Sequence, residues 1–309
     1  MQKSLSKSSL SIILLILLAG IWGSSFIFMK RGMETLDGQK IFSDSQVASL
    51  RMIIASLVLL PFTLFALKKI KTAKQFISLS LVGLCGNFVP AFLFTFAETE
   101  LSSGYAGMLN SFTPIFSIII GGLVFKQKIS PNQFIGVLIA FVGIILLMIA
   151  GNDLNNSGSW KHISAIVLAT FLYAISLNTI KHTLSGFKSM EITAISFGIL
   201  LLPGIFANFQ TDTLTVIQEN PHAMEGLFFI AILSIVGTAF ALILFNRIIA
   251  LQSTLFASSV TYLIPIVAVI IGFAFNETIN FYQIASMGIV IMGVLVANYW
   301  NLIFNNRTT

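Results

Sequence analysis

The feature that most constrains this chain is a series of apolar runs that recurs along its whole length. A helical run of about 20 residues crosses a hydrocarbon core about 30 Å thick. Ten such runs lie between short polar breaks, at residues 10–29, 45–67, 75–97, 103–125, 132–150, 161–180, 190–209, 226–249, 254–275 and 280–300. What remains suffices only for short loops and tails, so we expect no separate soluble domain.

Composition and local pattern both favour membrane helices. Only 9% of the 309 residues are charged, against about 25% in a typical soluble domain. A transmembrane β-barrel needs alternating apolar and polar residues, whereas "SIILLILLAG" is apolar almost throughout. The first run is longer than the apolar part of a cleaved signal peptide. We therefore predict an all-α membrane protein with ten transmembrane helices, of which the first is retained.

The distribution of basic residues predicts the orientation. Lys and Arg favour the cytoplasmic side of a membrane. With the N-terminus inside, the inner loops and tails hold twelve of the seventeen basic residues, the outer loops hold four, and Arg51 lies within a span. This predicts an N-in, C-in protein with cytoplasmic tails at 1–9 and 301–309. The net charge of +6 is thus a topology signal, and we expect no nucleic-acid partner.

An internal repeat divides the chain into two halves. A shift of 151 residues aligns Gly86 with Gly237 and Pro114 with Pro265, and a one-residue slip after Phe125 then aligns Gln127 with Glu277. The halves are residues 10–150 and 160–300, joined by a turn-rich linker at 151–159, which we expect outside the cytoplasm. Five spans are an odd number, so the second half enters the membrane from the opposite side. The pattern predicts a 5+5 inverted-topology repeat, typical of alternating access around a midplane site.

Polar residues inside the spans are the candidates for the substrate cavity, since such groups usually face another helix or water rather than lipid. Some occupy equivalent positions in the two halves, as Trp22 and Tyr173 do, or Ser111 and Tyr262. For any one of them, the alternative is a simple interhelical hydrogen bond worth about 0.6 kcal/mol. The candidates are Trp22, Ser25, Asn87, Asn110, Ser111, Tyr173, Asn178, Asn246 and Tyr262.

Two prolines and two charged residues complete the candidate site. Pro114 and Pro265 each remove a helical hydrogen bond and are expected to free a carbonyl four residues earlier. They are candidate hinges, the alternative being a static kink. Arg51 either reaches the surface with its long side chain, pairs structurally or contacts substrate. Glu98, near an outer span end, is either a solvated loop residue or a proton-coupling group.

The motifs as a whole resemble the EamA family of the drug/metabolite transporter superfamily. The similar stretches are "LAGIWGSSFIFMKRG" in span one, "SLRMIIASLVLLP" around Arg51, and "GLCGNFVPAFLFTFAETELSSGYAGMLNSFTPIFSIIIGG" in spans three and four. The second half carries the corresponding unit, with Glu277 after the ninth span. The first half departs from the family pattern, because Gln127 stands where an acid is usual. The resemblance implies a ten-helix transporter, with small-metabolite export as the favoured direction.

Missing features narrow the function further. The three histidines lie in loops or at span edges, no paired carboxylates occur at membrane depth, and Cys85 is the only cysteine. We therefore expect no catalytic residues, no metal site, no cofactor and no enzyme activity. A nearly uncharged cavity suits neutral or zwitterionic metabolites such as amino acids or their analogues. The prediction is a secondary transporter of the plasma membrane, the inner membrane in a bacterium, present as a monomer or homodimer. The alternative is a non-transporting membrane protein, either a receptor-like subunit or a lipid-handling enzyme.

Overall fold

The computed structural model describes residues 7–151, 159–252, 256, 257 and 259–304. Its secondary structure over these ranges is helical, apart from an isolated bridge between Glu34 and Lys40. In the same ranges, eight helices are long and apolar enough to cross a membrane, and two shorter apolar helices cover Val260–Ala274 and Phe281–Ala297. The all-α prediction is confirmed, with eight full-length candidate spans and two shorter ones in place of ten equal spans.

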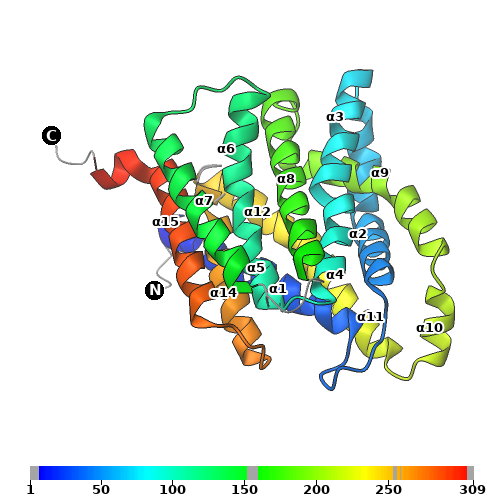
Figure 1. Ribbon diagram of the computed structural model, residues 1–309. Helices are drawn as coiled ribbons and strands as arrows, with labels where there is room; N and C mark the ends of the chain where they lie inside the picture. The colour runs from blue at the N-terminus through cyan, green and yellow to red at the C-terminus, as the bar shows by residue number, and fades with distance from the viewer. Residues whose placement is uncertain (1–6, 152–158, 253–255, 258, 305–309) are drawn as a thin grey trace, which may run out of the picture.

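Figure 1 shows the order of the helices along the chain. The long helices begin and end within a few residues of the predicted apolar runs, whereas the third, fourth and eighth runs are each divided between two helices joined by a π-helix or a 3₁₀ turn. The first half contains α1 (Lys7–Met33), α2 (Asp44–Ala66), α3 (Ala73–Gly83), α4 (Val89–Glu98), α5 (Ser103–Leu109), α6 (Thr113–Leu123) and α7 (Pro131–Gly151). The second half contains α8 (Ser159–Thr183), α9 (Ser189–Phe209), α10 (Thr213–Glu219), α11 (Ala223–Ser234), α12 (Ala241–Leu251), α14 (Val260–Ala274) and α15 (Phe281–Phe304).

The end of the first helix and the segment after α9 also differ from the prediction. Helix α1 continues to Met33, so Lys30 and Arg31 lie in its last turn rather than in an outer loop. Cations at a helix C-terminus interact favourably with the helix dipole, and Arg31 also gains an ion pair there. The short helix α10 was not predicted; it follows α9 at the edge of the molecule (Figure 1).

Each half contains one π-helix at the same place in the repeat. Leu84–Phe88 joins α3 to α4, and Ile235–Phe240 joins α11 to α12. Their first residues are separated by the 151-residue shift found in the sequence. A π-helix is a rare local widening that frequently marks a functional site. The repeat therefore extends to an irregularity of the backbone.

The turns before the last helix of each half also correspond. Lys126 and Asn276 adopt positive φ angles of 53° and 59°. Ser130 and Gln133 cap α7 through reciprocal bonds between side chain and backbone, and Asn280 with Gln283 caps α15 in the same way. These pairs are offset by 150 residues, as expected after the one-residue slip. The two-repeat architecture thus fits the structure.

The halves interlock through equivalent helices. Helix α2 packs against α9, and α7 packs against α15 at the opposite end of the bundle in Figure 1. In addition, α14 packs against α1 and α5, while α6 packs against α8. At the α7–α15 crossing, a Cβ on Gly143 would lie 2.7 Å from the Val290 nitrogen, and one on Gly293 would lie 2.6 Å from the Gly136 oxygen. Glycines let the two backbones approach closely, as at many membrane helix interfaces.

Candidate functional site

Arg51 of α2 and Glu98 of α4 are two ionisable side chains that lie within the bundle. Arg51 lies seven residues after the start of α2, about 10 Å along the helix axis. Its Nη1 donates to Met29 Sδ at 3.6 Å, and its buried Nε has no partner among the described residues. Glu98 lies within electrostatic reach of Lys30, Glu277 and Arg51, and Arg51 lies within reach of Tyr173 of α8. We call Arg51, Glu98 and Tyr173 the central cluster.

Glu98 is not a solvated loop residue, which was one of its two expected roles. It is the last residue of α4 and is 1% exposed. Within the described part of the chain, neither carboxyl oxygen has a hydrogen-bond partner. A buried ionisable group without partners is costly in a membrane protein and usually marks a functional position. Arg51 is half-buried.

Aromatic rings border the central cluster. Tyr173 stacks on Phe94 with ring centroids 6.0 Å apart, and Phe94 contacts Phe26 at 5.7 Å. Trp22, half-buried in α1, contacts Phe245 of α12 at 5.6 Å. The predicted equivalents Trp22 and Tyr173 therefore each contact a phenylalanine, Phe245 of α12 and Phe94 of α4 respectively.

The π-helices lie against the polar faces of α1 and α8. Trp22 Nε1 donates to the Gly237 carbonyl at 3.1 Å. Ser25 Oγ donates to Ile21 O at 3.0 Å and would lie 3.1 Å from a Cβ on Gly237. The equivalent contact in the other half joins Ser176 and Gly86, again too close for a side chain at the glycine. Asn87 lies within the first π-helix and is half-buried.

The two proline elements differ in local structure. Pro265 is buried inside the continuous helix α14, whereas Pro114 is the second residue of α6, which directly follows a 3₁₀ turn at Asn110–Phe112. The expectation of a free Asn110 carbonyl is wrong, because it accepts a hydrogen bond from the Thr113 N–H. The chain tightens to i→i+3 bonding where the proline removes the i→i+4 bond. The hydroxyls of Ser111 and Thr113 are buried and lack partners among the described residues.

Asn178 has a structural environment. Its Nδ2 donates to Ser117 O at 3.0 Å and to Ala174 O at 2.9 Å, and its Oδ1 accepts from Gln127 at 3.1 Å. Its amide is therefore committed to the contact between α6 and α8. Tyr262 of α14 packs against the main hydrophobic core. The side chain of Asn246 lies outside the described residues.

Glu277 makes a contact that the sequence did not reveal. Its two carboxylate oxygens accept the backbone N–H groups of Ser103 and Gly104, both at 2.8 Å. These N–H groups begin α5, where a carboxylate is stabilised by the helix dipole. The matching residue Gln127 instead accepts from Lys181 Nζ at 2.9 Å. The repeat alignment pointed to position 277 because Glu277 matches Gln127. The partners of Glu277 could not be predicted, because they come from a helix far away in the sequence.

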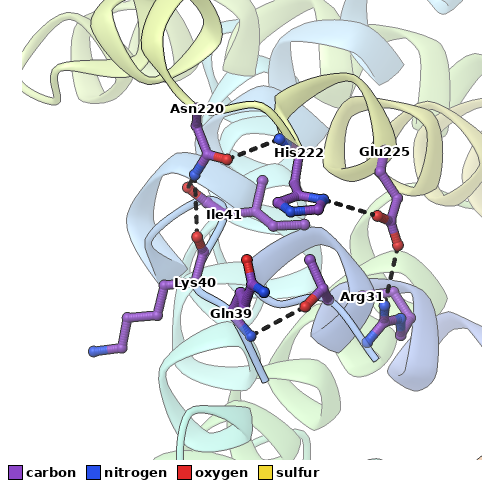
Figure 2. A network of polar contacts seen from close by, with 8 residues as sticks. Arg31, Gln39, Lys40, Ile41, Asn220, His222 and Glu225 are labelled. Atoms are coloured by element: carbon purple, nitrogen blue, oxygen red, sulfur yellow. Dashed lines mark hydrogen bonds and ion pairs between the residues drawn. The ribbon is translucent and has the colours of Figure 1, made fainter. Parts of the chain in front are cut away.

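A second polar network joins the α1–α2 and α10–α11 connections (Figure 2). Arg31 Nη2 lies 3.1 Å from Glu225 Oε1, and His222 Nδ1 lies 3.7 Å from Glu225 Oε2. Asn220 donates to the Lys40 carbonyl at 3.0 Å. An open cavity of about 410 Å³ adjoins this network and is lined partly by Gln39, Lys40, Asp212 and Glu219.

The Arg31–Glu225 pair should stabilise the fold. Arg31 is 4% exposed, so Glu225→Gln leaves a nearly buried guanidinium without its charged partner. We expect a loss of about 1 kcal/mol, because Glu225 itself is partly exposed. Thermal unfolding of the purified protein in detergent measures the effect. Glu219→Gln, which removes an exposed acid from α10, is the matched control, and equal shifts for both variants would contradict a specific contribution of the pair.

Comparison with known proteins gives matches over both halves. The model of the EamA-like transporter family matches residues 9–149 and again residues 160–299. The uncharacterized inner membrane transporter YedA of Escherichia coli K12 is 25% identical over 288 residues, covering 92% of this chain and 89% of YedA. An uncharacterized transporter of Archaeoglobus fulgidus is 25% identical over 293 residues, covering 92% of this chain and 97% of that protein. One solved crystal structure aligns with a TM-score of 0.57 at 13% identity, covering 96% of this chain and 99% of the other, which shows a shared fold.

Proposed function

Because the chain belongs to the EamA-like transporter family, whose model matches both of its halves, we propose that it moves small neutral or zwitterionic metabolites across the plasma membrane by alternating access. Export of amino acids or their analogues is the favoured activity. The family and the transporters related to this chain support membrane transport in general. The multi-pass helices and the match to an inner membrane transporter place the protein in the plasma membrane.

The observation that carries the proposal is a set of buried polar groups without partners inside the helix bundle. Glu98, Ser111 and Thr113 contribute such groups from α4, the 3₁₀ turn and α6 within the described ranges. Polar side chains in a membrane domain that serve packing alone are expected to be paired with a neighbouring helix, as Asn178 is. Groups left unpaired are suited to a passing substrate or ion.

The repeat supplies the proposed means of changing access. The equivalent π-helices, the prolines at matching positions of the repeat and the glycines at the α7–α15 crossing support two copies of one unit that exchange conformations. In this proposal the copies are inverted, both termini are cytoplasmic and the 151–159 linker lies outside. Pro114 and Pro265 serve as the hinges, and Glu98 is the group that would couple transport to protons.

Flux into proteoliposomes containing the purified full-length protein tests the function. Amino acids and related metabolites should move above the background of protein-free vesicles. Pro114→Ala and Asn110→Leu should lower this flux severalfold and change the unfolding temperature little, because they alter the hinge element rather than the core. Pro203→Ala, at a proline of α9 without an equivalent in the repeat, is the control and should retain flux.

Three outcomes would contradict the proposal at different levels. If no metabolite moves, the protein is a non-transporting membrane protein of the receptor-like or lipid-handling kind. If metabolites move and both variants transport normally, the proline elements only pack. A pH gradient that neither drives nor responds to transport would leave facilitated diffusion in place of proton coupling.

A further inference from the structure

We propose that Glu277 changes partner during transport. In the present structure its carboxylate binds the N–H groups at the start of α5, and in the state in which these two elements have separated it binds the Lys30 ammonium group. This inference rests on the proposed alternating access and names the groups that exchange at one end of the bundle. It follows from a difference between the two halves, which share one sequence pattern and make different contacts at equivalent positions.

Glu277 and its equivalent Gln127 are held in different ways. Each packs on a glycine: a Cβ on Gly272 would lie 2.7 Å from Glu277 Oε2, and a Cβ on Gly121 would lie 2.8 Å from the Gln127 amide nitrogen. Glu277 accepts the two N–H groups that begin α5, both at 2.8 Å. Gln127 Oε1 instead accepts from Lys181 Nζ, in the last turn of α8, at 2.9 Å. Among the described residues, equivalent side chains therefore contact partners that are not equivalent.

The partner of Gln127 has a counterpart in the first half. The 151-residue shift aligns Lys30 with Lys181, and the two lysines occupy the last turns of the equivalent helices α1 and α8. In the proposed inverted repeat, the two halves exchange conformations when access alternates. Each half then makes the contacts that the other makes in the present structure. Glu277 takes the place of Gln127, and Lys30 is the lysine that it meets.

The packing of three helices brings Lys30 to the same end of the bundle as Glu277. Helix α14 packs against both α1 and α5. Where the three helices meet, a Cβ on Gly107 of α5 would collide with α14 and lie 3.3 Å from the Phe26 ring of α1. Lys30 follows Phe26 by one turn on the same face of α1, about 6 Å further along the axis. Consistently, Lys30 and Glu277 both lie within electrostatic reach of Glu98, the residue that ends α4.

Lys30 is available for this exchange because its present ion pair is weak. Its Nζ lies 3.9 Å from Glu34 Oε1, one turn later in the chain, and both side chains are partly exposed. Such a pair contributes little to stability. When the start of α5 moves away, the Glu277 carboxylate loses two hydrogen bonds, and an unpaired carboxylate at the edge of a membrane is costly. An ammonium group, with its charge and three donors, replaces them.

The exchange is tested by measuring the distance between the two elements that separate. Spin labels are attached at Glu100→Cys, in the turn before α5, and at Thr278→Cys, in the turn after α14, with Cys85→Ala as the background. Both labelled positions are exposed. Pulsed electron paramagnetic resonance of the full-length protein in proteoliposomes gives the distribution of distances without any substrate. The labelled protein should show two distances, of which the shorter belongs to the present structure.

Variants of the two partners should change the ratio of the longer to the shorter distance. Lys30→Gln should lower this ratio about fivefold, because it removes a partner of the separated state only. Glu34→Gln is the matched control, since it removes the same surface ion pair but keeps Lys30, and the ratio should not fall. Lys30→Glu combined with Glu277→Lys should raise the ratio above that of the labelled protein. The ion pair is then restored with reversed charges, whereas an ammonium group at position 277 cannot accept the α5 N–H groups.

Results that contradict the exchange differ from those that contradict transport. Equal ratios for Lys30→Gln and Glu34→Gln would show that Lys30 acts only through its pair with Glu34. A combined variant that keeps the shorter distance would show that Glu277 does not hold the two elements together. If the labelled protein transports amino acids while one distance persists, the exchange is wrong and the transport function stands. If both distances occur and no metabolite moves, the proposed function fails and the change of partner stands.

Discussion

A disulfide between Gly104→Cys and Ile279→Cys is expected to stop transport. These positions join the start of α5 to the turn after α14, where a Cβ on Gly104 would lie 2.5 Å from Ile279 Cδ1. Glu277 already binds the N–H groups of Ser103 and Gly104 at the same place. This contact joins the two halves of the repeat, and we expect it to open when access alternates. A covalent link prevents that separation, so flux should fall to the level of protein-free vesicles.

The experiment starts from a cysteine-free background, Cys85→Ala, since Cys85 is the only native cysteine. Cross-linking is quantified by peptide mapping before flux is measured, and reduction should restore transport. The single variants Gly104→Cys and Ile279→Cys, treated with the same oxidant, are the matched controls. Normal flux through fully cross-linked protein would show that this contact does not open during transport.

The second large effect concerns stability at the α7–α15 crossing. Gly293→Leu would place a side chain against the Ala140 nitrogen and the Gly136 oxygen, which are backbone atoms that cannot move aside easily. We expect a destabilisation of about 3 kcal/mol, as for severe overpacking of a core. Gly288→Leu on the same helix is the control, because Gly288 is exposed and a Cβ there would meet nothing within 4 Å. Thermal unfolding in detergent should separate the two variants, and similar unfolding temperatures would contradict the role of this crossing.

Much of the fold could be predicted because a membrane imposes one requirement on every span. The apolar runs located the helices, and the 151-residue shift identified elements that the structure shows to be locally alike, such as the two π-helices. The shift did not reveal that these segments are π-helical. These segments contact residues of α1 and α8 that are far away in the sequence, as in the Trp22 bond to Gly237, and local sequence does not reveal such contacts. The broken third and eighth spans were therefore expected as simple helices.

The candidate site was predictable in composition and only partly in arrangement. Arg51 and Asn178 were both selected because they lie deep within a span. The structure shows that the Asn178 amide is hydrogen-bonded, whereas the Arg51 Nε has no partner among the described residues. Arg31 was assigned to a loop because it stands at the end of an apolar run. Its burial depends on Glu225, which lies 194 residues away in the sequence. Sequence patterns identify residues that need partners; tertiary packing decides which of them receive one.

The two π-helices also bear on the origin of the internal repeat. Both halves hold one at the same place, at Leu84–Phe88 and Ile235–Phe240, as expected if the unit already contained it when it was duplicated. The change of offset from 151 to 150 residues after Phe125 is present in one half only, and so dates from after the copies became separate.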